Sequence, residues 1–425
     1  MKKFLSLILI MVLSVTQITV AFGTYAQTNS ESDLVGEKFP ECDLTWSFNI
    51  ETGLLTLEGN GEMVFSGNAP WSAYKKEIKN VVVGEGITYL EGSLFYYISF
   101  DKIILPSTLE YVDSSVFHYA EFNELEIPSE NNLRVLDSYS YSGLDGTEWY
   151  KNQPDGCVYM GDFLFDYKGT APDNTTVKIK DGTRAINRNA FQSQSGIVDF
   201  EFCDSLERIG YKALDNTGWY DSKPNNSVIY AGNILYKLKG SSYYDSLTVK
   251  EGTVSIAEYA VYYKTIYNNY AYYETIYFPS SLKYIDDCAF ALNDLFLEEI
   301  VFAPGSQLEY IGEKAFGYNT VYFSGDTQKN NDFVIYGHKD TAAERYATEN
   351  GFKFVDLDAP VPSFELGDVN RDGSVNIKDA TAIQKNIAGL IEFDTEQNSL
   401  ADFNEDASVN IKDATAIQKK IAGLI

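Results

Sequence analysis

A short sequence pattern recurs through the middle of the chain, and this repetition limits the possible folds more than any other feature. Each copy has a short β-rich run, a turn with Pro or Gly, then Leu or Ile positions, and a final large apolar residue. The clearest copies are ETIYFPSSLKYIDDCAF (274–290) and EEIVFAPGSQLEYIGEKAF (298–316). Others lie at 81–95, 101–117, 123–141, 177–191, 200–214 and 247–261. A unit this short cannot bury its own apolar face, so the copies predict a stacked solenoid with a continuous internal ladder.

The residues that end the copies set the register of this stack. They are Phe95, Phe117, Tyr141, Phe191, Leu214, Val261, Phe290 and Phe316. Several of their intervals are 22 to 26 residues, and two are near 50 because material is inserted. The inserted segments are themselves a duplication, TEWYKNQPDGCVYMGDFLFDYKG (147–169) and TGWYDSKPNNSVIYAGNILYKLKG (217–240). Both contain a Gly-centred hairpin signal with apolar flanks, so we expect β-hairpins that project from the solenoid.

The repeat pattern resembles the leucine-rich repeats of the BspA-like bacterial surface proteins over roughly residues 40–355. The resemblance implies a β-rich leucine-rich-repeat solenoid of mixed α/β class. It also implies an N-terminal cap at 44–71 and a C-terminal cap at 336–355, with a short helix near Ala342–Thr348, because the ends of a stack must differ from its middle. Proteins of this family are associated with binding and adhesion, so the resemblance implies a protein-binding or cell-surface-binding module.

Aromatic residues are abundant, with 32 Tyr and 26 Phe. Aromatic rings can stack on sugars, so a glycan-binding surface is an alternative role for the solenoid. The best candidates are Trp149, Tyr150, Trp219 and Tyr220, in the two inserted segments. The competing interpretation is that these four side chains, like most of the aromatics, pack the core or the hairpins.

The charge and the scarcity of histidine exclude several function classes. The formal net charge is −28, so the chain has no means to neutralise a run of phosphates and we expect no nucleic-acid partner. There are two histidines, His118 and His338, and neither lies beside a recognisable nucleophile motif. The carboxylates are scattered through the repeats rather than set as a glycosidase pair. We therefore expect no catalytic residues and no enzyme.

Residues 1–26 read as a signal peptide, with Lys2 and Lys3 before an apolar stretch and cleavage after Ala26. The alternative is an uncleaved anchor, for which the apolar run is short. No second membrane-spanning candidate follows, so we expect an exported protein.

The four cysteines Cys42, Cys157, Cys203 and Cys288 show no CxxC spacing, which argues against zinc. Cys203 and Cys288 lie in apolar motifs and are interpreted as buried free thiols, with disulfides as the alternative.

A second duplication follows an acidic linker at 356–365 that contains the proline-bearing run DAPVPSFE (358–365). LGDVNRDGSVNIKDATAIQKNIAGLI (366–391) and LADFNEDASVNIKDATAIQKKIAGLI (400–425) agree at 21 of 26 positions. Each copy contains a twelve-residue loop whose oxygen-bearing residues match the spacing that wraps Ca²⁺. The expected metal ligands are Asp368, Asn370, Asp372, the Ser374 carbonyl, Asn376 and Asp379 in the first loop, and Asp402, Asn404, Asp406, the Ser408 carbonyl, Asn410 and Asp413 in the second. The alternative is a pair of acidic turns without metal.

The two loops differ at the sixth position, which needs positive φ. Gly373 occupies it in the first loop and Ala407 in the second. A side chain there should cost on the order of 1 kcal/mol, so we expect two calcium ions with the second bound more weakly. Val375 and Val409 should pack between the loops.

Each loop should run into a helix. Ile383, Ile387 and Leu390, and likewise Ile417, Ile421 and Leu424, follow the spacing of one apolar helix face. We expect no helix before either loop, so that the unit is a pair of loop–helix repeats.

This combination resembles a type I dockerin, the small all-α calcium-binding module that attaches cellulosomal proteins to the cohesin modules of a scaffoldin. The resemblance covers residues 366–425 and implies a secreted, cellulosome-associated protein at the bacterial surface. It also implies the same cohesin-contact positions in each copy. These are Ile377, Lys378, Gln384, Lys385 and Gly389, then Ile411, Lys412, Gln418, Lys419 and Gly423. Because the two sets are identical, the resemblance implies binding in two orientations. Ile-Lys replaces the familiar Ser-Thr in this set, which leaves the cohesin class open. A carbohydrate-binding accessory protein and a hydrolase in polysaccharide catabolism are the alternatives.

Overall fold

The computed structural model describes residues 34–39, 43–64, 69–136, 143–240, 243–261, 272–290, 297–320, 327–358 and 364–425. The predicted signal peptide lies outside the described residues, as do Cys42, Tyr141 and the middle of the linker, 359–363. The chain divides into two compact units, one up to Leu357 and one from Asp358 onward. Within the described residues, no helix has the length and apolar character needed to cross a membrane.

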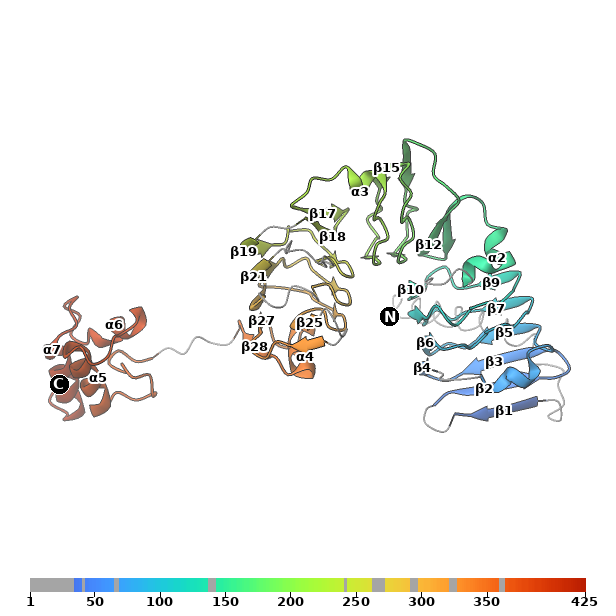
Figure 1. The fold of residues 1–425 in the computed structure, drawn as a ribbon. Coiled ribbons are helices and arrows are strands. Elements are labelled where there is room, and N and C mark those ends of the chain that lie inside the picture. Colours follow the sequence, from blue (N-terminus) through green and yellow to red (C-terminus); the bar gives the residue numbers. More distant parts are fainter. Residues whose placement is uncertain are drawn as a thin grey trace, which may run out of the picture. The chain divides into compact units, whose positions relative to one another are not determined.

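The first unit is a solenoid whose strands stack turn upon turn (Figure 1). It begins with an antiparallel meander, β1 (Leu34–Lys38), β2 (Thr45–Asn49) and β3 (Leu54–Glu58). From β3 onward the pairing is parallel, through β5 (Asn80–Val83), β7 (Lys102–Ile104) and β9 (Glu124–Glu126). The antiparallel strands β1 and β2 do not belong to a repeat, and they cover the first edge of the stack.

A second ladder of short parallel strands runs along the other side of the same turns. In the first part of the solenoid it consists of β4 (Gly61–Val64), β6 (Ile87–Glu91), β8 (Tyr111–Val112) and β10 (Val135–Leu136). In the later part it continues as two separate sheets. One contains β12 (Phe163–Lys168), β14 (Ala185–Ile186) and β16 (Arg208–Ile209), and the other contains β18 (Ile234–Lys239), β20 (Ser255–Ile256), β22 (Tyr284–Ile285) and β24 (Tyr310–Ile311). The second strand position of each turn is apolar and points inward, as at Leu90, Val112, Ile256 and Ile285, which are fully buried.

The remaining strands of the later turns lie opposite this ladder. They are β13 (Thr175–Lys178), β15 (Ile197–Glu201), β19 (Tyr243–Thr248), β21 (Tyr272–Phe278), β23 (Glu299–Phe302), β27 (Val334–Gly337) and β28 (Lys353–Asp356), with a small β25–β26 pair at Tyr318–Thr320 and Thr327–Lys329. Each regular turn thus gives one strand to each side.

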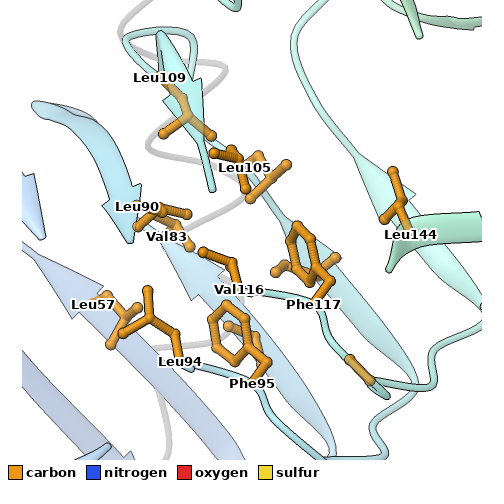
Figure 2. Close-up of a cluster of buried hydrophobic side chains, with 14 of the residues drawn as sticks. Leu57, Val83, Leu90, Leu94, Phe95, Leu105, Leu109, Val116, Phe117 and Leu144 are labelled. Atoms are coloured by element: carbon orange, nitrogen blue, oxygen red, sulfur yellow. The ribbon is translucent and has the colours of Figure 1, made fainter. Parts of the chain in front are cut away.

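Large apolar residues from successive turns fill the space between the two sides. Phe95 and Phe117 stack with ring centroids 5.7 Å apart, and Phe290 and Phe316 stack at 5.1 Å. Figure 2 shows Phe95 and Phe117 among the leucines and valines of one such cluster. Every predicted register residue within the described ranges is buried. The repeat register and the leucine-rich-repeat solenoid are therefore confirmed.

The two inserted segments form the expected hairpins, but they do not project from the solenoid. β11 (Gly156–Met160) pairs with β12, and β17 (Ser227–Ala231) pairs with β18. β12 then pairs in parallel with β14, and β18 with β20. The expectation of projecting hairpins was wrong because the second strand of each carries consecutive apolar residues, such as Phe163–Leu164 and Ile234–Leu235, that are fully buried in the ladder.

A short capped helix leads into each hairpin. These are α2 (Glu148–Lys151) and α3 (Gly218–Asp221), preceded in the first case by the 3-10 turn η3 (Leu144–Gly146). Thr147 and Thr217 accept hydrogen bonds from the backbone N–H of Tyr150 and Tyr220 and so cap the two helices in the same way. Each helix turns the chain so that its tryptophan packs inward.

The ends of the solenoid are closed by different devices. At the start, Trp71 in the 3-10 helix η2 (Pro70–Tyr74) is fully buried and donates its indole N–H to the Leu94 carbonyl, 3.0 Å away. At the end, α4 (Ala342–Asn350) packs on Phe316, the last of the residues that set the repeat register. The Tyr346 hydroxyl donates to the Phe316 carbonyl at 2.8 Å and accepts from its N–H at 3.0 Å. The predicted helix in the C-terminal cap is confirmed.

The second unit contains α5 (Ile377–Ile387), α6 (Thr395–Ala401) and α7 (Ile411–Ile421). Its core is small and consists of Val369, Ala380, Ile383, Ala401, Ala414 and Ile417. α6 directly precedes the second loop, so the expectation of no helix before either loop was wrong there. The cause is a capping box in which Asp394 accepts from the Gln397 N–H at 2.8 Å and starts a helix too short to show a period.

Candidate functional site

The first candidate metal loop is held together by its own carboxylates. Both oxygens of Asp379, which is fully buried, accept backbone N–H groups, from Asn370 at 2.9 Å and from Asn376 at 2.8 Å. Asp368, 1% exposed, accepts from the N–H groups of Asp372 and Gly373 at 3.1 and 2.9 Å. The first and last acidic residues of the loop therefore brace its backbone from inside.

The second loop repeats this arrangement nearly bond for bond. Asp413, fully buried, accepts from the N–H groups of Asn404 and Asn410 at 3.1 and 2.8 Å. Asp402 accepts from Asp406 and Ala407 at 3.0 and 2.9 Å. Ala407 has a φ of 64°, and Gly373 at the matching place has a φ of 85°. The second loop thus places a side chain in a left-handed conformation that only glycine adopts without cost.

The middle of each loop brings the other expected ligands together. In the first loop the Asn376 amide group donates to the Ser374 carbonyl at 2.9 Å and to Asp372 at 3.3 Å. In the second loop the Asn410 amide group donates to the Ser408 carbonyl at 2.7 Å. Asn376 and Asn410 also cap α5 and α7, accepting from the N–H groups of Lys378 and Lys412. The loop ligands and the start of each helix are therefore one hydrogen-bonded structure.

The donor chemistry of both loops suits a hard cation, because every candidate ligand is an oxygen and each candidate set contains three carboxylates. One lysine in each loop offsets part of that charge. Lys378 lies 3.3 Å from Asp372, and Lys412 lies 3.5 Å from Asp406. Nowhere in the described ranges do three Asp, Glu, His or Cys side chains already converge on a point suited to a metal ion. Calcium binding at these loops therefore stays a prediction.

The ten predicted cohesin-contact residues are all exposed. Ile377 and Ile411 are each 56% exposed at the first position of α5 and α7. Gln384 and Lys385 lie seven residues further on, as do Gln418 and Lys419 in the other copy, so each set shares one helix face with the first two residues. Gly389 and Gly423 follow the helix ends with φ of 68° and 67°. The structure thus builds the same surface twice.

Further exposed apolar residues adjoin this surface, and helical spacing groups them with the buried Ile383 and Ile417. Ile387 and Leu390 are 49% and 72% exposed, and Ile421 and Leu424 are 46% and 72% exposed. The only apolar residues that α5 and α7 bury in the described structure are one alanine and one isoleucine each, so the C-terminal part of the predicted apolar spacing lies in solvent. Contiguous exposed apolar residues on a small unit are typical of a binding surface.

None of the five positions that differ between the copies belongs to the predicted contact set. Two of them change charge, and one of these is Asn386, which Lys420 replaces in the second copy. Arg371 pairs with Asp394 and, at 3.1 Å, with Glu396 at the start of α6, whereas Glu405 stands at the matching place in the second copy. The loops are therefore anchored differently, while the exposed helix surfaces match.

In the solenoid, the four aromatic residues first considered for glycan binding are structural in part. Trp149 and Trp219 are 9% and 5% exposed and belong to the core clusters. Tyr150 and Tyr220 are half-buried, and the Tyr150 hydroxyl donates to Asp166. These residues support the hairpin turns rather than offer open ring faces. Cys157, Cys203 and Cys288, the described cysteines, are free and half-buried.

The solenoid also contains a polar cavity of about 220 Å³ lined by Tyr89, Tyr111, Arg134, Arg208 and Tyr310 among others. The guanidinium groups of Arg134 and Arg208 lie 4.5 and 4.8 Å from the Tyr310 ring centroid. Arg208 also contacts Asp286 at 2.9 Å. Burial raises the pKa of Asp286 from its ordinary value, against the effect of Arg208. Sequence reasoning missed this network because its members come from turns far apart in the chain.

The strand pairing and the loop–helix unit together define a leucine-rich-repeat solenoid followed by a separate dockerin-like module. The family described as the BspA type leucine rich repeat region matches residues 72–169, 159–269 and 236–331. The chain belongs to this family of BspA-type leucine-rich-repeat proteins. Residues 366–422 match the dockerin type I domain, which the chain carries at its C-terminal side.

Among solved structures, a leucine-rich repeat protein from Eubacterium ventriosum is 13% identical, covering 67% of this chain and 94% of its own, with a TM-score of 0.22. A leucine rich cell surface protein from Faecalibacterium prausnitzii is 12% identical, with coverages of 79% and 97% and a TM-score of 0.22. The pneumococcal vaccine antigen PcpA is 11% identical, with coverages of 76% and 100% and a TM-score of 0.19. No curated protein sequence matches. The family assignment therefore rests on the sequence match.

Proposed function

We propose that the chain is a secreted, non-catalytic component of a cellulosome-type assembly. The type I dockerin binds a cohesin module of a scaffoldin, and the solenoid is the part that binds a protein or a cell surface. In this proposal a signal peptide ends at Ala26, the repeat domain with its caps spans 40–355, and a linker at 356–365 precedes the dockerin at 366–425. The observation that carries the proposal is the exposed helix surface that the dockerin builds twice.

That surface has the composition expected of a partner-binding site. Ile377 and Ile411 are more than half exposed, although isoleucine is ordinarily buried. Each is followed by a lysine, and each helix ends with another exposed isoleucine, Ile387 or Ile421. Because the two sets match, the cohesin can bind through either α5 or α7 after a half-turn of the module. Each orientation would then use one copy.

Calcium enters the proposal through the loops that start α5 and α7. The residues that would hold it are the twelve loop ligands named above, and the ion would neutralise carboxylates that otherwise repel one another. The dockerin core of six small and medium residues is marginal alone. Calcium binding is therefore expected to supply folding free energy, and cohesin binding is linked to it.

A calcium-dependent pull-down tests this function. Full-length protein is incubated with immobilised type I cohesins of different specificity, with calcium and with excess chelator. We expect capture by at least one cohesin in calcium and its loss in chelator. Unchanged capture in chelator would contradict the calcium mechanism, and no capture by any cohesin would contradict the proposal.

The alternative role is a carbohydrate-binding accessory protein or a hydrolase in polysaccharide catabolism. The modules found, a leucine-rich-repeat region and a dockerin, are of non-catalytic types. Release of reducing sugar from plant polysaccharides by the purified chain would favour the hydrolase. Retention on polysaccharide without release of sugar would favour the accessory role.

A further inference from the structure

The polar cavity of the solenoid is lined by charged side chains of both signs, which come from turns far apart in the chain. Its volume is about 220 Å³, and its lining includes Arg134, Arg208, Asp286, Asp287 and Tyr310. This volume is far above the roughly 15 Å³ that one water needs, and it is below the roughly 300 Å³ of a pocket for a drug-sized ligand. The cavity therefore suits a small polar molecule.

Two of the lining side chains form an ion pair whose hydrogen bonding is incomplete. Arg208 and Asp286 are 6% and 8% exposed, and a guanidinium nitrogen lies 2.9 Å from one carboxylate oxygen. In the part of the chain that the structure describes, neither side chain makes a hydrogen bond to a third group. A buried ion pair is stabilising only where its remaining donors and acceptors are satisfied. The pair therefore leaves donors and an acceptor oxygen for a molecule in the cavity.

The pKa of Asp286 indicates that Arg208 does not fully compensate for the burial of this carboxylate. Burial raises the pKa of Asp286, and Arg208 opposes this rise only in part. The neighbouring carboxylate of Asp287 acts in the same direction as burial. A further cationic group beside Asp286 would therefore stabilise its ionised form.

The cavity also has guanidinium groups for an anionic group to contact. The Arg134 guanidinium lies 4.5 Å from the centroid of the Tyr310 ring and 3.1 Å from Glu110, and its side chain is 28% exposed. Among the described residues, Glu110 is the one polar group that pairs with it. The Arg208 guanidinium lies 4.8 Å from the same ring centroid. Two cationic side chains thus border the cavity beside one tyrosine.

A ligand with one charge of each sign fits this lining better than a ligand with a single charge. A simple cation would also approach Arg134 and Arg208, and a simple anion would also approach Asp286 and Asp287. A neutral molecule would bind less strongly, because hydrogen bonds between charged groups are about twice as strong as neutral ones. In a free amino acid the ammonium and the carboxylate are attached to the same carbon, which matches acidic and basic groups that lie side by side.

We propose that this cavity binds a free amino acid, with its ammonium group at Asp286 and its carboxylate group at Arg134 and Arg208. The proposal goes beyond the proposed function, because it requires neither the dockerin nor a macromolecular partner. It gives the solenoid a small-molecule site in addition to its proposed role as the binding part of the chain.

Calorimetric titration of the full-length protein tests the class of ligand. The probes are free L-alanine, L-serine and L-glutamine, each compared with three blocked derivatives. The amide keeps only the positive charge, the N-acetyl compound keeps only the negative charge, and the N-acetyl amide keeps neither. We expect wild type to bind at least one free amino acid, and to bind its blocked derivatives about tenfold more weakly or worse, because each lacks a charge-assisted hydrogen bond.

The first variant is Asp286→Asn, which keeps the shape of the side chain and removes its charge. It should weaken binding of the free amino acid about tenfold or more. The matched control is Asp162→Asn. Asp162 also pairs with one arginine, Arg184 at 3.4 Å, and its Oδ1 atom is buried without a hydrogen bond, but it does not line the cavity. The control should bind like wild type.

Arg134→Met is a second variant, and it keeps the test decisive if Asp286→Asn fails to fold. Arg134 is less deeply buried, and methionine can still pack on Tyr310. This variant should also bind the free amino acid about tenfold more weakly. The bound amino acid should raise the unfolding temperature of the wild-type solenoid, because it binds the folded state alone, and should raise that of either variant much less.

Several results would overturn the proposal. Wild type could bind no free amino acid, or could bind a blocked derivative equally well. Either site variant could bind like wild type, or Asp162→Asn could lose binding as much as Asp286→Asn does. Capture by an immobilised cohesin depends on the dockerin and should be unchanged in all three variants. Amino-acid binding without any cohesin capture would contradict the proposed docking function alone.

Discussion

The ring of Phe403 lies where a side chain on Gly367 would have to go. A Cβ placed on Gly367 would be 2.7 Å from the ring of Phe403, closer than real contacts allow. Gly367 and Phe403 belong to different copies of the dockerin repeat, and at the matching places Ala401 and Val369 are both fully buried. Across the shared core, a glycine thus faces a phenylalanine on one side, where an alanine and a valine stand at the matching places. The core residues of the two copies therefore cannot replace one another.

Gly367→Ala should destabilise the dockerin by about 1–3 kcal/mol, because overpacking displaces neighbours and Gly367 has a φ of 98°. Thermal or denaturant unfolding of the full chain measures this in the dockerin transition, with the solenoid transition as internal reference. A second change, Phe403→Val, copies the smaller residue of the other repeat and should recover part of the loss. An unaffected dockerin transition in the single variant would contradict this packing account.

Ala407→Gly should strengthen calcium binding at the second loop. Removing the side chain from a left-handed position is expected to gain on the order of 1 kcal/mol, which is about fivefold in affinity. Calcium titration by calorimetry should show two unequal sites in wild type that become more alike in the variant. Gly373→Ala is the matched control and should weaken the first site. Two sites of equal calcium affinity in wild type would contradict the prediction that the second loop binds calcium more weakly.

Ile377→Asp alone should weaken cohesin binding only about twofold, since one of two equivalent orientations is lost. Ile411→Asp alone should behave in the same way, and the double variant should lose binding altogether. Both residues open a helix, where aspartate is tolerated by the helix dipole, so circular dichroism should confirm that α5 and α7 persist. If either single change abolished binding, the two-orientation proposal would be wrong.

Arg208→Met should destabilise the solenoid by about 3–5 kcal/mol at neutral pH, because it leaves the buried Asp286 carboxylate without its partner. Burial already raises the pKa of Asp286 above its ordinary value, and removing Arg208 raises this pKa further. The folded variant then binds a proton more tightly than the unfolded chain. Protonation of Asp286 therefore stabilises the folded variant. This contribution is fully present below the ordinary aspartate pKa of about 3.9, and it is lost as the pH rises through the raised pKa of Asp286 in the folded state.

The measurement for this variant is the unfolding temperature against pH. The gap between wild type and Arg208→Met should narrow as the pH falls toward about 4. The double variant Arg208→Met, Asp286→Asn lacks the buried charge. The difference between its unfolding temperature and that of the wild type should therefore be nearly the same at all pH values. A gap that does not depend on pH would mean that lost packing on Tyr284 and Tyr310, not the charge, causes the destabilisation.

The repeat register could be predicted from sequence because each turn needs one large apolar residue at a fixed place, and Phe117 or Phe290 satisfies that need without help from distant segments. The hairpins were recognised as hairpins but assigned outside the stack. Their turn signal is local, whereas the parallel pairing of Phe163 with Ala185 depends on where the next turn lies. Local signals identify an element more readily than they identify its neighbours.

In the dockerin, too, local features could be predicted from sequence, whereas features that depend on neighbouring elements could not. That the oxygen-bearing residues gather within each loop could be predicted from spacing alone, since a twelve-residue loop can brace itself, whereas their role as ligands stays a prediction. The exposure of Ile387 and Leu390 could not be predicted, because helical periodicity marks an apolar face without showing that the dockerin has nothing to cover it.

The two hairpin turns have one further consequence, for how such a chain can change its length. Each copy brings its own threonine cap, its own inward tryptophan and a bulge at the same place, between Val158 and Tyr159 in one and between Ile229 and Tyr230 in the other. Nothing in the cap or the bulge of one copy depends on the other. Recombination within the gene could therefore add or remove such a block in whole steps, and so adjust the reach of the solenoid without redesigning its core.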